Sequence, residues 1–591
     1  MGFTKSSLIS AALLASQASA TLQPIVKEGN KFFYENGTQF YMKGIAYQQA
    51  VGAAGAATTQ KTFVDPLADE KACKRDIPNL QKAGTNTIRV YQIDPTANHD
   101  ACMKMLDDAG IYVIADLGEP STSIDRENPE WNTKLYDRYK AVVDVLAKYT
   151  NTIGFFSGNE VTNQANNTMA SAYVKAATRD TKKYIKQKGY RWMGVGYATN
   201  DDKDIRDPLA AYFNCGDQDA AIDYWGYNIY SWCGDSDFTK SQYDQHIKNF
   251  ASYSVPVFLA EYGCIDGIGG AEGRKWTETT ALYSDRMTGT FSGGIVYMYF
   301  QEDNDYGLFK ASANGGGSTM KNFDALVNVM KDVNPKTIEK SSFTSNNKPL
   351  DCPGIQSNWL AASALPPTPD QAVCECMTKS ATCAPSSSLS EKDYGEIFSF
   401  ICGAGDSCKG INGNATTGQY GAFHGCDSKS KLTYALDQYY KSQRNSATAC
   451  DFKGKATVVT PQQAASTCSS LLSAATAAAD KANAGAGSGS DTSKNAASSF
   501  RAPGGLAQMA LGMYVAAAVG VACWIGGIWS GSGPFGRGGG GGESYRSSLG
   551  SGSRCGGAGA STGTGTVTSL RGRKTHLLKE ANPPGPRGQV T

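Results

Sequence analysis

The sequence predicts an α/β protein that consists of a (β/α)8 barrel, a small disulfide-rich, mainly helical module and a low-complexity tail. Three observations indicate this order. Eight apolar, β-branched or aromatic runs recur through about the first 350 residues, with helix-like segments between several of them. Eight cysteines then lie within about a hundred residues, and the chain beyond them is rich in Ala, Ser and Gly.

The eight runs are spaced like parallel strands that are joined by helices. They cover residues 41–46, 87–91, 111–116, 153–157, 193–197, 224–227, 257–261 and 295–300. Between the third and fourth runs, residues 134–148 carry apolar side chains at a period near 3.6, which predicts a helix. A parallel barrel gathers the carboxyl ends of its strands at one face, and the active sites of such barrels form there.

Bulk properties narrow the possible functions. The formal charge of +2 on 591 residues and the isoelectric point near 7.7 give no long-range reason to expect a nucleic-acid partner. The 4 histidines are scattered, so the 16 cysteines indicate disulfides rather than zinc, and no motif indicates a metal or nucleotide cofactor. Residues 1–20 are typical of a secretory signal peptide, and sequons at Asn36, Asn166 and Asn414 are compatible with N-glycosylation.

Two of the apolar runs deliver a carboxyl group to the end of a strand. One ends in Gly-Asn-Glu at Glu160, and the other ends at Glu261. On the predicted count they follow strands four and seven and face each other across the barrel mouth. Two such carboxyl groups suit a retaining mechanism, in which one attacks the sugar and the other transfers protons. The plain alternative is that each glutamate only leaves the core where its strand meets solvent.

Further polar side chains cluster at the same predicted strand ends. Asp201 and Arg206 fall in the loop after the fifth run. Tyrosine suits a sugar site because its ring face stacks on the sugar while its hydroxyl forms hydrogen bonds, although a single Tyr among 30 is more often a packing residue. The other members of this set are Gln48, Tyr91, Asp116, Asn228, Tyr230, Tyr297 and Tyr306.

Longer motifs carry a family resemblance. Asn159-Glu160 together with Glu261 resembles the large barrel clan of retaining glycosidases, in which Asn precedes the acid/base. More narrowly, residues 21–470 resemble the fungal β-1,3-glucanosyltransferases of glycoside hydrolase family 72. The motifs are Tyr47-Gln48, Arg89-Val-Tyr91, Phe156-Ser-Gly-Asn-Glu160, Tyr227-Asn-Ile-Tyr-Ser-Trp-Cys233, Phe258-Leu-Ala-Glu-Tyr-Gly-Cys264 and Gly293-Gly-Ile-Val-Tyr-Met-Tyr299.

The resemblance implies that Glu160 is the acid/base and Glu261 the nucleophile. It also implies substrate contacts by Tyr91, Asn159, Asp201, Arg206 and Tyr297, with Gln48, Asp116, Tyr230 and Tyr306 as further candidates. Such an enzyme splits an internal β-1,3-glucan linkage and transfers the new reducing end to the non-reducing end of another glucan. Glucan chains are then both donor and acceptor, and we expect a monomer. The alternatives are a hydrolase with the same carboxyl pair, a non-catalytic glucan-binding wall protein and a structural mannoprotein.

The cysteines divide between two regions. For the barrel region, residues 21–352, the resemblance suggests the pairs Cys73–Cys102, Cys233–Cys264 and Cys215–Cys352, although six cysteines alone allow 15 arrangements. Residues 370–470 resemble a family 43 carbohydrate-binding module, with implied pairs Cys374–Cys426, Cys376–Cys468, Cys383–Cys450 and Cys402–Cys408. This module either binds glucan or only supports the barrel. Its candidate stacking residues are Tyr420, Phe423, Tyr439 and Tyr440.

The tail predicts attachment to a membrane. Residues 471–505 read as a flexible Ser/Ala/Gly-rich stalk, and residues 506–529 are apolar and long enough to span a bilayer. Small residues followed by a spacer and an apolar run resemble a glycosylphosphatidylinositol (GPI) attachment signal, which places the enzyme on the outer leaflet of the plasma membrane and in the cell wall. Residues 530–591, rich in Gly and basic residues, depart from that pattern, so we expect them to be absent from the mature protein. The alternative is a single-pass membrane protein with a cytoplasmic tail.

Overall fold

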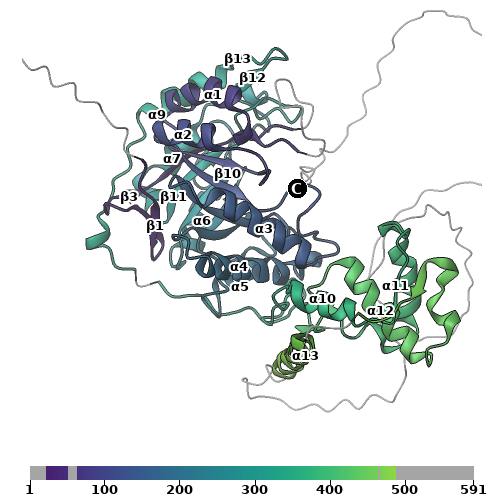
Figure 1. Ribbon diagram of the computed structural model, residues 1–591. Helices are drawn as coiled ribbons and strands as arrows, with labels where there is room; N and C mark the ends of the chain where they lie inside the picture. Colours follow the sequence, from purple (N-terminus) through teal and green to yellow (C-terminus); the bar gives the residue numbers. More distant parts are fainter. Residues whose placement is uncertain (1–20, 51–62, 346, 463–465, 487–591) are drawn as a thin grey trace, which may run out of the picture. The chain divides into compact units, whose positions relative to one another are not determined.

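The largest part of the protein (Figure 1) is a closed barrel of eight parallel strands. Their order around the barrel is β10-β11-β4-β5-β6-β7-β8-β9. The computed structural model describes residues 21–50, 63–345, 347–462 and 466–486. The predicted (β/α)8 fold is confirmed. The strands are β4 (Met42–Ala46), β5 (Thr87–Val90), β6 (Tyr112–Asp116), β7 (Thr152–Asn159), β8 (Gly194–Asn200), β9 (Trp225–Asn228), β10 (Val257–Tyr262) and β11 (Phe291–Val296).

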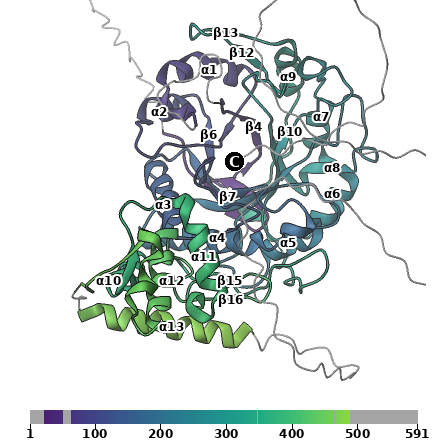
Figure 2. The ribbon, with the colours of Figure 1, turned by 90° about the vertical axis from the view of Figure 1, so that its right-hand side faces the viewer.

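Helices cover the outside of the barrel and connect consecutive strands (Figure 2). Polar side chains cap several of them, because the first backbone amides of a helix lack partners inside it. Asp69 accepts hydrogen bonds from the amides of Lys71 and Ala72, and Asn132 accepts one from Leu135. The helices are α1 (Glu70–Lys82), α2 (Asp100–Asp108), α3 (Thr133–Leu146), α4 (Ala170–Gln187), α5 (Arg206–Asn214), α6 (Tyr243–Phe250), α7 (Thr277–Leu282), α8 (Asp285–Thr288) and α9 (Lys321–Lys331), and a small hairpin of β12 (Phe309–Ala311) and β13 (Gly317–Thr319) precedes the last.

The eighth barrel strand, β11, begins and ends earlier than the predicted run at residues 295–300. A Cβ atom on Gly293 would lie 2.1 Å from the backbone oxygen of Met42, so glycine at this position lets β11 approach β4 closely. Gly293 and Gly294 interrupt the apolar pattern, so the predicted strand began after them, at residue 295. Tyr297 therefore follows the strand, whereas the sequence predicted it within the strand.

A short antiparallel sheet precedes the barrel and was not predicted. It consists of β1 (Ile25–Glu28), β2 (Lys31–Tyr34) and β3 (Gln39–Phe40). Phe32 lies 5.8 Å from the ring of Tyr224 and 6.1 Å from that of Phe258, and all three belong to one buried cluster with residues of the barrel strands. The sheet therefore adds aromatic side chains to the barrel core.

The ring of Tyr224 fills the barrel interior at a level where the neighbouring strand carries glycines. A Cβ atom on Gly196 would lie 2.2 Å from the ring of Tyr224, and one on Gly194 would lie 2.5 Å from it. The Tyr224 hydroxyl donates to the backbone oxygen of Phe155 at 2.6 Å. Barrel interiors are filled with side chains, so small residues on one strand make room for a tyrosine beside the next.

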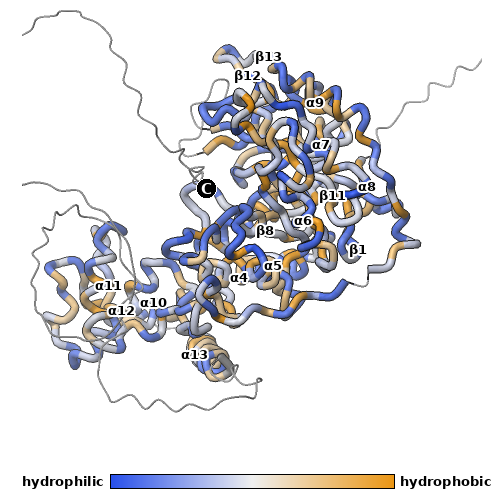
Figure 3. Tube along the Cα trace, turned by 180° about the vertical axis from the view of Figure 1, so that it is seen from behind, coloured by the Kyte–Doolittle hydropathy of each residue, from blue (hydrophilic) through white to orange (hydrophobic). Residues whose placement is uncertain are grey.

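The cysteine-rich module is small and mainly helical, as predicted. Its core gathers Ile401, Leu432 and Leu436, which are fully buried, and Figure 3 shows hydrophobic positions on the same helices. The elements are α10 (Gln371–Lys379), β14 (Cys383–Pro385), α11 (Tyr394–Gly403), β15 (Gly413–Asn414), β16 (Gln419–Tyr420), α12 (Ser428–Ser442), β17 (Ala456–Val458) and α13 (Ser466–Ala486).

All seven predicted disulfide pairs are present in the part of the chain that the structure describes. Three belong to the barrel and four to the module. They are Cys73–Cys102, Cys215–Cys352, Cys233–Cys264, Cys374–Cys426, Cys376–Cys468, Cys383–Cys450 and Cys402–Cys408.

Helix α13 corrects the prediction for the start of the tail. A flexible stalk was predicted from residue 471, but residues 471–486 continue this helix. Alanine has the highest helix propensity, and Cys468 ties the first turn to Cys376. Near the other end, Asn483 accepts a hydrogen bond from the amide of Tyr420 at 2.9 Å. An Ala-rich composition was thus read as flexible although two tertiary contacts hold it as a helix.

The membrane-related predictions lie outside the described residues. These are the signal peptide (1–20), the remainder of the stalk (487–505), the apolar segment (506–529) and the basic tail (530–591). Within the described residues, no helix has the length and apolar character needed to cross a bilayer.

Candidate active site

Glu261 lies near the carboxyl end of β10, with 8% of its surface exposed. The hydroxyl of Tyr91 donates to its Oε1 at 2.7 Å, and the hydroxyl of Tyr230 donates to its Oε2 at 2.8 Å. Nη1 of Arg89 lies 3.3 Å from Oε1. Both oxygens are thus oriented by hydrogen bonds, with a positive charge beside them, and a nucleophile needs such a fixed orientation.

Glu160 directly follows β7 and has a left-handed backbone with φ of 49°. This conformation is unfavourable for a residue with a side chain, and such strain persists where the surroundings enforce it, often at functional sites. Here the amide of Glu160 donates to the backbone oxygen of Ala198 at 2.9 Å, and Nη2 of Arg126 donates to its carbonyl at 2.7 Å. These contacts fix the direction in which the carboxyl group leaves the strand.

The two glutamates have different electrostatic surroundings. Burial raises the pKa of Glu160, and the nearby negative charge of Glu261 raises it further, whereas the hydrogen bond from Asn228 opposes the shift. A carboxyl group with a raised pKa holds its proton at a higher pH than an ordinary glutamic acid. Glu160 is therefore suited to donate a proton, while Glu261 is surrounded by hydrogen-bond donors.

A continuous chain of contacts joins the two carboxyl groups. Nδ2 of Asn228 donates to Oε1 of Glu160 at 2.7 Å and lies 3.2 Å from Oδ1 of Asn159. Nη2 of Arg89 donates to that same Oδ1 of Asn159 at 3.0 Å, and Nη1 lies beside Glu261. The ends of β5, β7, β9 and β10 thus bring the predicted pair into one polar network at the carboxyl face of the barrel.

Arg89 is the centre of this network and was not among the predicted site residues. It is fully buried, and its Nε and Nη2 bind both oxygens of Asp116 at 3.1 and 3.0 Å. Its guanidinium also lies 4.4 Å from the ring centroid of Tyr91 and 4.5 Å from that of Phe156. The signal in the sequence was an arginine inside an apolar strand, since a buried charge requires partners.

Four predicted tyrosines form one aromatic wall of the site. The rings of Tyr230 and Tyr306 lie 5.6 Å apart, those of Tyr297 and Tyr306 lie 5.3 Å apart, and Tyr297 is 6.4 Å from Tyr91. All of these contacts are edge-to-face. Two of the hydroxyls, those of Tyr91 and Tyr230, bind Glu261. The wall thus combines apolar ring surface with hydroxyl groups, as a sugar site requires.

Two further predicted contacts have structural partners. Gln48 is buried: its Nε2 donates to the backbone oxygen of Val64 at 2.6 Å, and its Oε1 accepts from the amide of Tyr91 at 3.1 Å. Asp116 is the ion-pair partner of Arg89. Gln48 thus fixes the backbone of Tyr91, and Asp116 fixes the side chain of Arg89. Their positions support an indirect role more than a direct contact with substrate.

Asp201 and Arg206 form a second polar cluster after β8. Nε of Arg206 donates to Oδ1 of Asp201 at 2.7 Å and lies 2.9 Å from the hydroxyl of Tyr227, which also donates to Asp201. Nε2 of the buried His246 lies 3.4 Å from Oδ2 of Asp201. Burial lowers the pKa of His246 to about 4, so this ring is neutral above that pH and adds no charge to the cluster.

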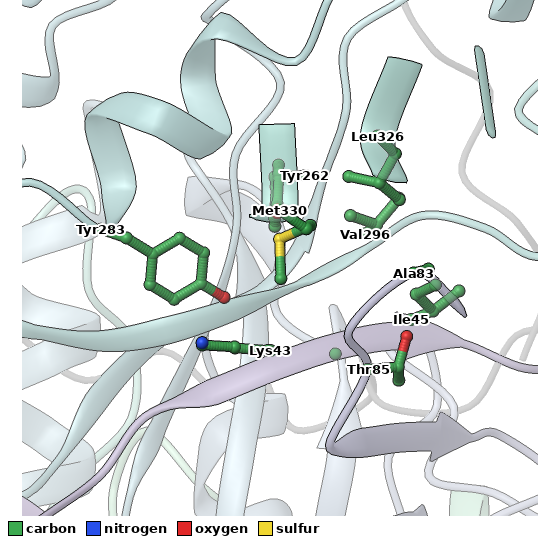
Figure 4. Close-up of a pocket in the computed structure, with 10 residues that line it drawn as sticks. Lys43, Ile45, Ala83, Thr85, Tyr262, Tyr283, Val296, Leu326 and Met330 are labelled. Atoms are coloured by element: carbon green, nitrogen blue, oxygen red, sulfur yellow. The ribbon is translucent and has the colours of Figure 1, made fainter. Parts of the chain in front are cut away.

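The described part of the chain contains small cavities both near and far from these residues. One of about 30 Å³ is lined by Asp116, Glu119 and Asn159 among others, and it adjoins the network around Arg89. Another, of about 10 Å³, lies between β4 and α9 (Figure 4). Its lining includes Lys43, Tyr283 and none of the predicted site residues. A water molecule needs roughly 10–15 Å³, so this second cavity is far too small to hold a sugar ring.

Comparison with known proteins decides the family. The sequence model of the glucanosyltransferase family matches residues 14–334, which is more than half of the chain. The chain belongs to the glucanosyltransferase family. The X8 domain matches residues 381–457 and so covers most of the cysteine-rich module.

Members of the family from several fungi are similar over most of their length. A 1,3-beta-glucanosyltransferase of Arthroderma benhamiae is 47% identical over 541 residues, which are 88% of this chain and 98% of that protein. The 1,3-beta-glucanosyltransferase gas1 of Schizosaccharomyces pombe is 44% identical over 81% of this chain and 87% of its own.

Solved structures of the family are also similar. A glutamate-to-glutamine mutant of Saccharomyces cerevisiae Gas2p, in complex with laminaritetraose and laminaripentaose, has a TM-score of 0.70 and 38% identity, and the match covers 78% of this chain and 99% of that one. Gas2p in complex with laminaritriose and laminaritetraose has a TM-score of 0.69 and 40% identity, over 75% of this chain and 98% of that one.

Proposed function

We propose that this protein is a retaining 1,3-β-glucanosyltransferase that uses β-1,3-glucan as both donor and acceptor. The single observation that supports it best is the network of Glu160, Asn228, Asn159, Arg89 and Glu261 at the carboxyl face of the barrel. It provides one oriented carboxylate and one carboxyl group with a raised pKa, which is the division of work that a double displacement requires. Membership of the glucanosyltransferase family supports the substrate class.

The first step forms a covalent intermediate. The carboxylate of Glu261 attacks the anomeric carbon of a glucosyl unit, and the bond from that carbon to the glycosidic oxygen breaks. Glu160 gives its proton to the departing oxygen, so the leaving fragment departs as a neutral alcohol. Asn159, oriented by Arg89, is placed to bind the hydroxyl group next to the anomeric carbon, a contact that strengthens in the transition state.

The second step transfers the glucan. Glu160, now ionised, takes the proton from the 3-hydroxyl at the non-reducing end of an acceptor glucan. The acceptor oxygen attacks the anomeric carbon, and the ester bond to Glu261 breaks. Two inversions at the same carbon retain the β configuration. An acceptor sugar must compete with water for the intermediate, so the enzyme needs contacts that hold the acceptor. We propose Asp201 and Arg206 for this role, since the family resemblance implies them as substrate contacts.

An oligosaccharide assay tests this function. The purified protein is incubated with a reduced laminari-oligosaccharide as donor, and the products are separated by length. Transfer predicts products longer than the donor, with a β-1,3 linkage at the new junction. Products that are all shorter than the donor would contradict the proposal and identify a hydrolase.

We further propose that the protein acts on the cell surface, held by a GPI anchor, with the X8 module as a family 43 carbohydrate-binding module. The order of the predicted stalk and the apolar segment in the sequence supports the anchor, and the match to the X8 domain supports the binding module. All three sequon residues, Asn36, Asn166 and Asn414, have exposed side chains, as glycan attachment requires. Release of the protein from intact cells by a phosphatidylinositol-specific phospholipase C tests the anchor.

A further inference from the structure

Three aromatic side chains form a surface patch on the cysteine-rich module. Phe400 is 56% exposed, and Tyr439 and Phe452 are half-buried. The ring centroids of Phe400 and Tyr439 lie 5.7 Å apart, and the other two pairs lie 5.8 Å apart, all edge-to-face. The three residues come from α11, α12 and the turn after Cys450. Exposed aromatic clusters on soluble proteins mark binding sites, because burial in the core would otherwise be favoured.

The patch is held rigidly. Two residues beyond Phe400, Cys402 forms a disulfide with Cys408, and two residues before Phe452, Cys450 forms one with Cys383. Phe452 itself has a left-handed backbone with φ of 45°. A phenylalanine rarely adopts this conformation, and here it occurs at a ring that is only half covered. Rigid rings lose little conformational freedom when they bind a ligand.

Charged residues of both signs neighbour the patch in the sequence, and several of them form ion pairs. Lys441 pairs with Asp437 at 2.6 Å, and Lys455 lies 3.1 Å from both Asp393 and Glu396. Residues 441–448 are exposed, and several have neutral side chains that form hydrogen bonds. These are Ser442, Gln443, Asn445, Ser446 and Thr448. Ion-paired charges and neutral hydrogen-bonding groups suit an uncharged, polyhydroxylated ligand. They suit an anionic ligand less well, because a paired cation has little positive charge left to attract it.

The four stacking candidates predicted from the sequence differ in burial and in ring contacts. Tyr420 and Tyr440 are 6% and 8% exposed, and Tyr420 packs against Tyr173 of the barrel. Phe423 is half-buried, and its ring lies 5.1 Å from that of Tyr434 at an angle of 43°, away from the three-ring cluster. Of the four, Tyr439 is the one whose ring contacts Phe400 and Phe452. Neighbouring positions of one helix point about 100° apart, so Tyr440 lies in the core instead.

We propose that Phe400, Tyr439 and Phe452 form a binding platform for β-1,3-glucan on the X8 module, separate from the catalytic site. The faces of pyranose rings stack on such side chains while the flanking amides and hydroxyls bind sugar hydroxyl groups. The identity of the polysaccharide rests on the proposed function. A second contact on the same chain raises the local concentration of a long glucan at the enzyme but adds nothing for a short one.

Adsorption to insoluble β-1,3-glucan tests the platform in the full-length secreted protein. Phe400→Ala is the primary variant, because this side chain is the most exposed of the three and lies outside the module core. Tyr439→Ala is the second. Val458→Ala is the matched control, since Val458 is 52% exposed on the same module and has no aromatic ring. Binding isotherms and the rate of transfer between short laminari-oligosaccharides are measured for each, with circular dichroism to verify folding.

The expected result is adsorption weakened roughly five- to tenfold by Phe400→Ala and by Tyr439→Ala, and within about twofold of wild type for Val458→Ala. Transfer between short oligosaccharides stays within about twofold in all three. Equal adsorption by wild type, F400A and Y439A overturns the proposal. Binding to phosphatidylcholine vesicles is measured in parallel. If F400A loses vesicle binding while its adsorption to glucan is unchanged, the proposal is also overturned and the patch is a membrane contact. Adsorption is read without turnover, so failure of the transferase activity leaves this test intact.

Discussion

Nη1 of Arg89 lies 3.3 Å from Oε1 of Glu261, and the two side chains are 0% and 10% exposed. The same guanidinium binds both oxygens of Asp116 and the side-chain oxygen of Asn159. One buried cation therefore faces two carboxylates and one amide. This arrangement makes Arg89 the residue that sets the relative positions of the proposed nucleophile and of the asparagine beside the proposed acid/base.

The planar fork of Arg89 leads to a first prediction. Arg89→Lys keeps the positive charge but cannot bind Asp116 with two parallel hydrogen bonds while it also reaches Asn159. We expect kcat for transfer to fall about 10²-fold, the size of effect seen when one oriented donor is lost. Initial rates and the melting temperature are measured together. Wild-type kcat in a folded R89K protein would show that the charge alone suffices.

The two glutamates are expected to differ on an activated donor. A dinitrophenyl β-laminarioligosaccharide has a leaving group that needs no proton, so Glu160→Gln should still form the glycosyl-enzyme, whereas Glu261→Gln should not. Intact-protein mass spectrometry detects the mass of the laminarioligosaccharyl group on E160Q. Turnover by E261Q at more than about 1% of the wild-type rate would contradict the assignment of the nucleophile.

The cluster of Asp201, Arg206 and Tyr227 leads to a prediction about acceptor choice. Arg206→Ala removes the donor that binds Asp201 at 2.7 Å, so the proposed acceptor site loses its shape while Glu261 keeps its partners. We expect the share of hydrolysis among the products to rise severalfold, with donor consumption within about threefold of wild type. Lys203→Ala is the control, because Lys203 is an exposed cation of the same loop. An unchanged ratio of transfer to hydrolysis would remove Arg206 from the acceptor site.

Glu278 leads to a prediction about stability. It is 3% exposed in α7, and burial raises its pKa from 4.5 to about 7 despite the opposing charge of Arg274. The folded state thus binds this proton more tightly than the unfolded state. Its contribution to stability is complete below pH 4.5 and is lost as the pH rises through 7. The loss is on the order of 3 kcal/mol.

Glu278→Gln keeps the shape of the side chain without the charge. The melting temperature of E278Q should therefore fall less than that of wild type between pH 5 and pH 8, and thermal scans at both pH values measure this. A parallel decline in the two proteins would show that other groups set the pH dependence. Glu160→Gln is expected to act in the same direction, because its pKa is also raised.

The barrel could be predicted because its strands are apolar runs at regular intervals, and both glutamates could be placed because each run ends at the active-site face. Secondary structure was predicted less accurately where contacts with distant residues, and not the local sequence, determine it. Gly293 and its neighbour hid the start of β11, and the Ala-rich start of the predicted stalk is a helix because Asn483 and Cys468 have partners elsewhere in the module.

The sequence by itself determined the fold class and the resemblance that gave all seven disulfide pairs, and it singled out Glu160 and Glu261 as the proposed catalytic pair. Only the tertiary structure decided which of the other polar residues meet the carboxyl groups. It showed that Arg89, Gln48 and Asp116 hold the residues around Glu261 in position. It also showed that Tyr440 lies in the module core whereas Tyr439 lies at its edge. The physical reason is that strand periodicity reveals where a side chain leaves the core, whereas its partners depend on strands that are distant in sequence and adjacent only in the closed barrel.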